Sequence, residues 1–386
     1  MHDKKPIVYQ LSEFVGETGN GVNEYVYQTC NLLSDEIEFN FIYFDLTEKK
    51  ISTEYLSNGF KIIHFPRIFA KGFLIPNLFN QWLDSISKNC IFHLHSVFRP
   101  LNFTVERLLK KKSIKFIYTP HDSYSKNSMV TKALLKKIFF ALFDKNVLDN
   151  AYLVHAITSW GLSDLEKLTS NKIKLVTNFF KDNNYYQRLR YDDLKKQICY
   201  IGRLDIFQKG IDLQLEAYRL FKKDQKLKYI FIGNYNDRQL RDLEEILIEK
   251  KLELGSDIEL TGLIPEDQKN QILSNSYVYM QLSRFEGFGL SIVEALSFGK
   301  PVIISENVPI NKEIKKHGGG FVVSNPIEAS DALNTLFNMS EKEYLAISKK
   351  ARQCYLEAFH PDVAKPKLLE MYNYVLANQS MKSLSA

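Results

Sequence analysis

Short apolar runs alternate with amphipathic segments through the first half of the chain. The runs have the length and the aromatic and β-branched content of buried strands. Segment 21–33 has a helical repeat instead, because Tyr25, Val26 and Cys30 fall on one stripe. Strands separated by helices predict a parallel sheet that is covered on both faces. The expected strands are 7–11, 39–44, 61–65, 91–95, 116–119 and 152–157.

A polar and charged segment, 182–197, interrupts this pattern and is the expected linker between two domains. After it the alternation of strands and helices restarts. The chain has 386 residues, more than the ~250–300 at which one hydrophobic core stops growing. We therefore expect an α/β protein with two doubly wound, Rossmann-like domains that face a central cleft at the carboxyl ends of their strands. The expected bounds are 1–181 for the first domain, 198–358 for the second, and 359–386 for a C-terminal helix that packs back on the first.

The composition, with 45% hydrophobic and 25% charged residues, is that of a soluble globular protein. The four cysteines are scattered, without the C-x-x-C spacing of a metal or redox site, and suit a reducing compartment. The first ten residues lack the apolar core of a signal peptide, and no apolar run reaches the ~20 residues that span a bilayer. We expect a cytoplasmic protein, a location that is compatible with peripheral attachment to the inner face of the cell membrane.

A candidate site lies at 282–296, where a strand end, a glycine-containing loop and a helix start follow one another. Gly287 and Gly289 allow positive φ angles and a close approach of the backbone to a ligand. The helix expected from Leu290 offers N–H groups and a partial positive charge to a phosphate. This segment therefore predicts an anion site that suits a diphosphate.

Two glutamates flank that helix start, Glu286 in the loop and Glu294 in the helix. A carboxylate at either place can accept hydrogen bonds from ribose or sugar hydroxyls. Taken singly, each glutamate is more often a surface residue or a partner of the helix dipole. Their combination with the glycine loop favours binding of a nucleotide sugar.

Arg203 and Lys209 lie together in the loop that follows strand 198–201. Charge-assisted hydrogen bonds from such cations suit a diphosphate. They would also stabilise a departing nucleoside diphosphate without a metal ion. The chain has no Asp-x-Asp motif, the usual carboxylate pair for a metal-bridged diphosphate. We therefore expect neither a metal nor a cofactor.

The second half of the chain resembles the C-terminal domain of retaining GT-B glycosyltransferases of family 4. The resemblance is strong over 198–325 and looser in the first half, and Ser291 stands where the family often has proline. It implies the GT-B fold, with an acceptor-binding N-terminal domain and a nucleotide-sugar-binding C-terminal domain. The matching stretches are GRL-x4-KG (202–210), FIG (231–233), TGLIP (261–265), FEGFGLSIVEALSFGKPVI (285–303) and GGGFVV (318–323).

The resemblance also implies roles for the candidate residues. Arg203 and Lys209 would bind the donor phosphates, and Glu294 the ribose. Glu286 would hold the donor sugar, and Gly262 and Leu263 would lie against the base. The backbone that would hold the sugar and diphosphate together with Glu286 belongs to Gly287, Phe288, Gly289 and Leu290.

The first half contributes weaker signals. The loop 16–22, with Gly19 and Gly21, resembles the family's N-terminal glycine loop, which reaches the donor phosphates and the acceptor. Glycines are also common in loops between a strand and a helix, whatever the function of the loop. His121 follows an apolar strand and resembles the family's active-site histidine, which contacts the donor sugar. A lone histidine is more often structural, but its place at a strand end favours function.

Three further residues lie close to the end of an earlier strand. His93 and His95 alternate onto one strand face, and a metal site would need a third ligand that the sequence does not supply. We expect His95 to lie near an acceptor. Arg99 follows closely and is a candidate partner of an acceptor phosphate.

Segment 110–145 is the most basic part of the chain, which carries a net charge of +6. Within it, 129–143 places lysines on one flank and bulky apolar residues elsewhere. A basic amphipathic helix of this kind lies in a membrane interface, and anionic lipid is one partner that suits the patch. Core packing of the apolar residues under a solvated lysine face is the alternative. Nucleic acid is not expected, because no recognition motif accompanies the lysines.

These signals together predict an enzyme, a retaining hexosyltransferase. It would move a hexosyl group from a nucleotide diphosphate sugar, with UDP the preferred carrier, to a hydroxyl of a saccharide, such as a lipid-linked polysaccharide precursor. His121 and Glu286 would orient the sugar at the reacting carbon. One alternative is a nucleotide-sugar epimerase on the same fold, which would need further acid and base carboxylates. The other is a non-catalytic partner subunit of a glycosyltransferase.

Overall fold

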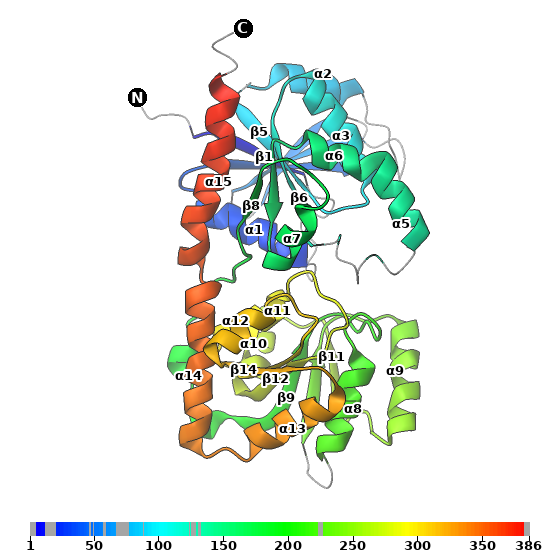
Figure 1. Ribbon diagram of the computed structural model, residues 1–386, viewed down its shortest axis with the longest axis vertical. Helices are drawn as coiled ribbons and strands as arrows, with labels where there is room; N and C mark the ends of the chain where they lie inside the picture. The colour runs from blue at the N-terminus through cyan, green and yellow to red at the C-terminus, as the bar shows by residue number, and fades with distance from the viewer. Residues whose placement is uncertain are drawn as a thin grey trace. The chain divides into compact units, whose positions relative to one another are not determined.

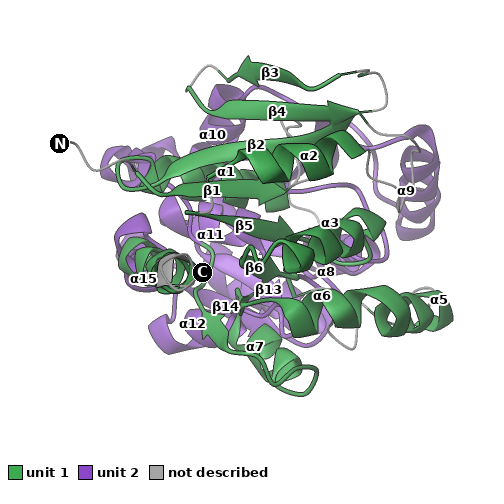
Figure 2. Ribbon diagram, turned by 90° about the horizontal axis from the view of Figure 1, so that it is seen from above, with its two compact units in different colours: residues 1–178, 364–386 green, residues 179–363 purple. Residues whose placement is uncertain are grey.

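We describe a computed structural model of the chain. The structure describes residues 5–11, 21–45, 48, 50–56, 59–66, 77–87, 89–122, 124, 129, 133–222 and 227–381. The chain divides into two compact units, which are coloured separately in Figure 2. Unit 1 comprises residues 1–178 and 364–386, and unit 2 comprises residues 179–363. Helix α15 (Pro361–Met381) begins in unit 2 and belongs to unit 1 from residue 364 onward.

Unit 1 is built on an eight-stranded sheet in the order β3-β4-β2-β1-β5-β6-β7-β8, parallel except for the antiparallel pair β3 and β4. Helices lie along both faces of this sheet (Figure 1). The strands are β1 (Ile7–Leu11), β2 (Glu38–Asp45), β3 (Ser52–Tyr55), β4 (Lys61–Pro66), β5 (Cys90–His95), β6 (Phe116–Thr119), β7 (Leu153–Ala156) and β8 (Ile173–Leu175). Besides α15, the helices are α1 (Gly21–Leu33), α2 (Asn77–Ser85), α3 (Pro100–Lys111), α5 (Ala133–Phe139), the π-helix η1 (Phe140–Asp144), α6 (Lys145–Asn150) and α7 (Ser159–Leu165).

Strand alternation divides the sheet of unit 1 into an apolar face and a partly polar one. Tyr9 and Leu11 of β1 pack into the hydrophobic core that includes residues of α2, α3 and α6. Gln10, between them, points to the other face and donates from Nε2 to the Tyr372 hydroxyl of α15 at 3.1 Å. Because side chains alternate along a strand, the polar residues of neighbouring strands gather on this second face.

Unit 2 is built on a parallel six-stranded sheet in the order β11-β10-β9-β12-β13-β14. Its strands are β9 (Lys195–Ile201), β10 (Lys228–Ile232), β11 (Ile258–Gly262), β12 (Ser276–Gln281), β13 (Val302–Ser305) and β14 (Gly320–Val323). The α-helices are α8 (Ile211–Lys222), α9 (Asp237–Lys250), α10 (Glu266–Asn275), α11 (Leu290–Ser297), α12 (Asn311–His317), α13 (Pro326–Phe337) and α14 (Glu341–Ala358). Two short 3₁₀ segments, η2 (Tyr185–Arg188) and η3 (Tyr191–Asp193), precede β9.

Both sheets reverse their strand order at one point. In unit 1 the chain runs from β1 outward through β2 and then returns to the other side of β1 with β5. In unit 2 it runs from β9 outward through β10 and β11 and returns beside β9 with β12. Ligands of open α/β sheets bind where the strand order reverses, beyond the carboxyl ends of the strands. The switch points of the two units are therefore β1/β5 and β9/β12.

The expected α/β class with two Rossmann-like parallel sheets is confirmed. Many expected elements also occur at or near their predicted bounds, among them β1, α1 and α11. The sequence patterns did not reveal β3, β8 or β14. β3 is short, polar and mostly exposed at the sheet edge, and β8 has three residues, so neither shows a periodic apolar signal. Segment 182–197 holds η2, η3 and the start of β9 and falls within unit 2.

Candidate active site

Two loops meet at the switch point of unit 2. One follows β9 and ends at Gly210, and the other follows β12. Gly210 has φ +60°, and a Cβ there would lie 2.1 Å from the carbonyl oxygen of Leu282. The backbone N–H of Arg284 donates to the Gln208 carbonyl at 2.9 Å. Glycine at 210 therefore lets the two candidate loops pack directly against each other.

Lys209 and Glu286 form an ion pair across these loops. Lys209 Nζ lies 2.7 Å from Oε1 and 2.8 Å from Oε2 of Glu286, and the two side chains are 12% and 11% exposed. Glu286 Oε2 also accepts hydrogen bonds from Gln281 Nε2 and Ser283 Oγ, each at 3.1 Å. The carboxylate is therefore held in place from two elements, although the two ion-paired residues are 77 positions apart.

Helix α11 begins directly after this carboxylate loop. Gly289 has φ +95° and occupies the N-cap position, and its carbonyl accepts the first bonds of the helix, from the N–H of Ile292 at 2.9 Å and that of Val293 at 3.3 Å. The N–H groups of Leu290 and Ser291 precede these bonds at the start of α11. Phe288 is buried, and its ring packs on that of Phe359 with centroids 5.8 Å apart. Phe288 thus anchors the loop through its side chain, while Gly287 is partly exposed.

Glu294 lies one turn further along α11 and is buried. Its Oε1 lies 2.5 Å from Nζ of Lys269 in α10, in an ion pair whose carboxylate side is 6% exposed. The structure places Glu286 and Glu294 in two different ion pairs, each with a lysine from another element.

The remaining donor-site candidates of unit 2 are more exposed. Arg203 is exposed and its Nη2 lies 3.3 Å from Gln208 Oε1 in its own loop. Gly262 ends β11 with φ +67°, and its carbonyl accepts from the N–H of Gly233 at 3.1 Å. Leu263 follows with 62% of its surface exposed. An exposed leucine beside a strand end offers an apolar surface that could pack on a flat ring.

In unit 1, His121 lies just beyond the carboxyl end of β6. It is buried, and both it and Asp122 have φ +55°, a conformation that costs non-glycine residues roughly 1–3 kcal/mol each. Thr158 donates a hydrogen bond to the Asp122 carboxylate, and burial raises the pKa of that carboxyl to about 7. A Cβ on Gly161 would lie 1.8 Å from Asp122 Oδ1. Thr158 and Gly161, at the start of α7, thus hold the strained turn at His121 and Asp122 in place.

His95, at the end of β5, contacts His121 directly. Its Nδ1 lies 3.1 Å from Nε2 of His121, and its Nε2 lies 2.8 Å from Oε1 of Gln10. Both ring nitrogens of His95 are therefore engaged by protein groups. Burial lowers the pKa of both histidines, that of His121 to about 3.

The other candidates of unit 1 have simpler surroundings. Arg99 is half-buried at the N-cap position of α3, before Pro100. Gly21 is the first residue of α1, and a Cβ there would meet nothing within 4 Å. Gly19 and most of its loop lie outside the described residues.

Several residues with a part in these sites escaped the sequence analysis. Gln281 and Ser283 bond to Glu286, and their i, i+2 spacing at a strand end was a readable signal. Lys269 and Tyr372 had no such signal in the sequence, because each is a single polar residue on a helix and meets its partner only in the folded chain.

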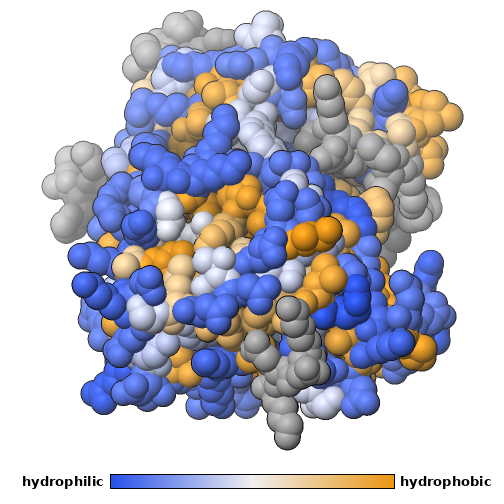
Figure 3. Space-filling view, turned by 60° about the horizontal axis from the view of Figure 1, so that its bottom comes forward, coloured by the Kyte–Doolittle hydropathy of each residue, from blue (hydrophilic) through white to orange (hydrophobic). Residues whose placement is uncertain are grey.

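Helices α5 and η1, which form the described part of segment 129–143 from residue 133 on, have two different apolar faces. Over the described part from residue 133, aromatic rings pack inward: Phe143 lies 5.2 Å from Phe103 of α3, centroid to centroid. The aliphatic side chains point outward, and apolar side chains gather over α5 at the upper right of Figure 3. The exposed fractions are 72% for Leu134, 66% for Leu135, 47% for Ile138 and 58% for Leu142.

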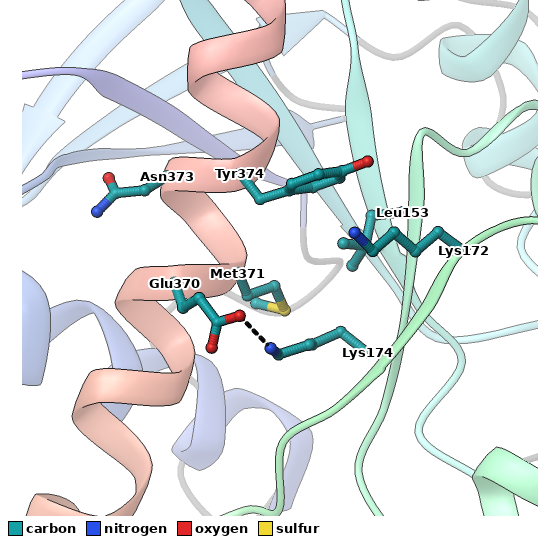
Figure 4. A pocket seen from close by; sticks show the side chains of 7 residues that line it. All are labelled: Leu153, Lys172, Lys174, Glu370, Met371, Asn373 and Tyr374. Carbon is teal, nitrogen blue, oxygen red and sulfur yellow. Dashed lines mark hydrogen bonds and ion pairs between the residues drawn. The ribbon is translucent and has the colours of Figure 1, made fainter.

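A separate hollow of about 380 Å³ runs along α15 in unit 1 (Figure 4). Lys174 reaches across it to Glu370 at 2.5 Å, and Lys172 Nζ lies 3.7 Å from the ring centroid of Tyr374. Leu153 at its floor is the first residue of β7, so the hollow lies toward the amino ends of the strands. His121 lies at the opposite, carboxyl ends, and we assign the hollow no part in the candidate site.

Within the described part of the chain, no group of three or more His, Cys, Asp or Glu side chains is arranged to hold a metal ion. None of the helices in that part is both long and apolar enough to cross a bilayer. The four cysteines are buried and unpaired by disulfides.

Residues 182–354 match the sequence profile of the family described as glycosyl transferases group 1. Over 380 residues the chain is 22% identical to the gpi3 subunit of phosphatidylinositol N-acetylglucosaminyltransferase from Schizosaccharomyces pombe, covering 95% of this chain and 77% of that protein. It is 23% identical over 254 residues to GDP-mannose:cellobiosyl-diphosphopolyprenol alpha-mannosyltransferase from Xanthomonas oryzae, covering 64% of each.

Solved structures share the whole fold. Sucrose-phosphate synthase from Thermosynechococcus elongatus superposes with a TM-score of 0.78 at 15% identity, over 97% of this chain and all of that one. Anabaena HepE, solved in complex with UDP and glucose, gives a TM-score of 0.74 at 15% identity, over 95% and 99% of the two chains.

Proposed function

Because residues 182–354 match the group 1 glycosyltransferase family and the whole chain has the GT-B fold, we propose a specific reaction for it. It moves a hexosyl group from a nucleotide diphosphate sugar to a hydroxyl of a saccharide acceptor, with the anomeric configuration retained. UDP is the proposed carrier, and a lipid-linked polysaccharide precursor is the proposed acceptor.

The ion pair between Lys209 and Glu286 is the observation that carries the donor half of this proposal. It lies at the switch point of unit 2, beside the start of α11. Partial burial makes separation of the two charges costly unless a ligand replaces both partners. A sugar diphosphate does so, since its phosphate can take Lys209 while a sugar hydroxyl donates to Glu286. Gln281 and Ser283 would keep the carboxylate in place during this exchange.

The same residues can stabilise the transition state. Negative charge grows on the departing diphosphate as the glycosidic bond breaks. Lys209, Arg203 and the N–H groups at the start of α11 would meet that charge without reorganisation. We propose that the departing phosphate takes the proton of the incoming hydroxyl. No metal or cofactor is proposed.

We assign the other donor contacts by the same reasoning. Glu294 would accept hydrogen bonds from the ribose hydroxyls, with Lys269 paired to its carboxylate. Exposed Leu263, next to Gly262, would pack on the base. In unit 1, His121 would contact the donor sugar, and Gly19 and Gly21 would belong to a phosphate-contacting loop.

For the acceptor, two observations favour a lipid carrier. The names of the two relatives above contain phosphatidylinositol and a diphosphopolyprenol. The outward aliphatic residues of α5 and η1 lie beside Lys136 and Lys137. Apolar side chains that enter lipid and cations that meet anionic headgroups suit a peripheral helix at the cytoplasmic membrane face. Arg99 is the proposed partner of an acceptor phosphate, and His95 we now assign to supporting His121.

Release of nucleoside diphosphate tests the reaction. Purified protein is incubated with UDP-, GDP- and ADP-hexoses, with and without lipid-linked saccharides, and free nucleotide and glycosylated product are measured. We expect UDP release that an acceptor accelerates, and a product whose anomeric configuration matches the donor. A thermal shift by UDP alone, larger than by GDP or ADP, would support the base assignment. Absence of both release and binding for every donor would favour a non-catalytic subunit and contradict the proposal.

Co-sedimentation with vesicles tests the membrane assignment separately. The protein should pellet with vesicles that contain anionic phosphatidylglycerol and much less with neutral phosphatidylcholine. The double variant Leu134→Ser/Leu135→Ser should lose this binding, whereas Ile248→Ser, at a 79%-exposed position of α9, should keep it. Equal binding by both variants, or binding unaffected by lipid charge, would contradict the assignment.

A further inference from the structure

A continuous chain of hydrogen bonds crosses the polar face of the sheet in unit 1. It begins at a backbone carbonyl after β8 and ends at His121, and α15 supplies one member of it. Neighbouring strands contribute the rest, each from the face opposite the apolar core. In order, the members are the Val176 carbonyl, His155, Thr119, His93, Tyr372, Gln10, His95 and His121.

Each imidazole in this chain is neutral near pH 7. Burial lowers the pKa of all four histidines, and neighbouring rings would repel one another if charged. The pKa of His155 falls to about 4 and that of His121 to about 3. A neutral imidazole has one N–H and one bare nitrogen, so it donates on one side and accepts on the other.

The carbonyl at the start of the chain sets the first direction. His155 Nε2 lies 2.9 Å from the Val176 oxygen, which can only accept, so Nε2 carries the hydrogen. The Nδ1 of His155 is then bare and accepts from the Thr119 hydroxyl at 3.0 Å. The Thr119 hydroxyl has a single hydrogen, and this bond to His155 uses it.

The same argument fixes the donors and acceptors in the middle of the chain. Thr119 Oγ1 must accept from His93, whose Nε2 lies 2.7 Å away and therefore holds the hydrogen. The Nδ1 of His93 is then bare and accepts from the Tyr372 hydroxyl at 2.8 Å. The Tyr372 oxygen in turn accepts from Gln10 Nε2 at 3.1 Å, which fixes the orientation of that amide.

The last two links reach His121. Gln10 Oε1 accepts from His95 Nε2 at 2.8 Å, so His95 Nδ1 is bare. That nitrogen lies 3.1 Å from His121 Nε2, which must donate. The seven hydrogen bonds of the chain thus run in one consistent direction.

We propose that this chain holds His121 in the tautomer with hydrogen on Nε2, so that Nδ1 is its lone-pair nitrogen. Thr119 and Tyr372 are then positioning residues, because they act on His121 only through other groups. The tautomer itself does not depend on the proposed function. Only the role of Nδ1 rests on it, which is to accept a hydrogen bond from a hydroxyl of the sugar. The opposite tautomer would present an N–H there and could not accept.

The tautomer can be measured directly by long-range ¹H–¹⁵N NMR on protein labelled with ¹⁵N in its histidines. His121 is assigned from the loss of its signals in His121→Gln. In the wild type, the Nε2 of His121 should have the shift of a protonated nitrogen and Nδ1 that of a bare one. A wild-type His121 protonated on Nδ1, or on both nitrogens at pH 7, would overturn the proposal whether or not the protein transfers sugar.

Two substitutions test the role of the chain. Tyr372→Phe removes the hydroxyl that joins His93 to Gln10, and Thr119→Val removes the hydroxyl that joins His155 to His93. In each we expect a second tautomer of His121 and a roughly tenfold fall in kcat with the donor KM within about twofold. Thr119→Ser keeps the hydroxyl and should therefore retain both the single His121 tautomer and the wild-type kcat. Unchanged His121 shifts in folded Tyr372→Phe and Thr119→Val would show that the chain does not set the tautomer.

Discussion

The two units place functional side chains at the same kind of position but hold them by different chemistry. In unit 2 the candidate residues at β9/β12 are charged, with Lys209 paired to Glu286 and Lys269 to Glu294. In unit 1 the residues near β1/β5 and the end of β6 form a chain of neutral groups that ends at His121. The contrast fits the two proposed tasks, since paired charges can be exchanged for a charged diphosphate, whereas neutral groups in fixed directions can recognise hydroxyls.

The energetic reasons for the two arrangements also differ. A partly buried ion pair is costly to break but is readily replaced by a ligand of matching charge. A buried neutral chain is stable only when every donor and acceptor is satisfied, and one missing member leaves its neighbours unpaired. Substitutions in unit 2 should therefore act mainly on donor binding and turnover, and those in unit 1 on geometry and stability.

Removal of the cation in unit 2 should have the largest effect. Lys209→Ala deletes the partner of Glu286 and a charge that would meet the departing phosphate, and kcat/KM for the nucleotide sugar should fall by about 10³. Steady-state assays of nucleoside diphosphate release measure the effect. Lys228→Ala, which breaks an exposed ion pair with Glu259 in the same unit, is the control and should stay within about twofold. Similar rates for Lys209→Ala and the wild type would remove Lys209 from the site.

Separation of the two loops in unit 2 should cost the most stability. Gly210→Ala puts a Cβ 2.1 Å from the Leu282 carbonyl at a left-handed position, and we expect a loss of about 3 kcal/mol in the free energy of unfolding. Urea denaturation provides the measurement. Gly255→Ala is the matched control, because Gly255 is also left-handed, with φ +95°, but a Cβ there meets nothing within 4 Å. It should cost only about 1–2 kcal/mol, the strain alone. Equal losses would show that the loop contact is not what requires glycine at 210.

The neutral chain of unit 1 should have an acid-dependent contribution to stability. The pKa of His155 falls from 6.5 to about 4 on folding, so the unfolded chain binds the proton more tightly. The contribution of neutral His155 is complete above pH 6.5 and is lost as the pH falls from 6.5 toward 4. Relative to the wild type, His155→Gln should therefore be most destabilised at pH 8 and progressively less so at pH 6 and 4.5. Urea unfolding of both proteins at each pH tests this, and a penalty that is constant or grows toward acid would contradict a neutral His155.

The smallest effect on stability is expected at Gly21, where the two roles of a glycine can be told apart. A Cβ at this first position of α1 meets nothing within 4 Å, so Gly21→Ala should change the free energy of unfolding by less than about 1 kcal/mol. If the backbone at Gly21 approaches the donor phosphates, the donor KM should nevertheless rise severalfold. Unchanged KM and unchanged stability together would show that Gly21 only starts the helix and has no role in donor binding.

The sequence alone predicted many of the local elements and supplied the candidate residues of both sites. Apolar periodicity predicted β1, α1 and α11 close to their observed bounds, because burial of one face imposes a repeat that is visible in the chain. The order of strand, glycine loop and helix at 282–296 predicted an anion site for the same kind of reason. Short or polar edge strands such as β3 and β8 carry no such repeat and were missed.

Only the tertiary structure decided which groups meet. Lys209 and Glu286 are 77 positions apart, and His93 and Tyr372 are 279 apart. Periodicity shows which face of a helix or strand is buried, but it does not show which distant face covers it. For the same reason the sequence left open whether the apolar residues of 129–143 form core or surface. Among the residues that the structure describes, Phe143 packs inward and Leu134 is exposed. Composition and spacing set the available chemistry, and chain packing selects the pairs, because contacts between remote segments leave no local pattern.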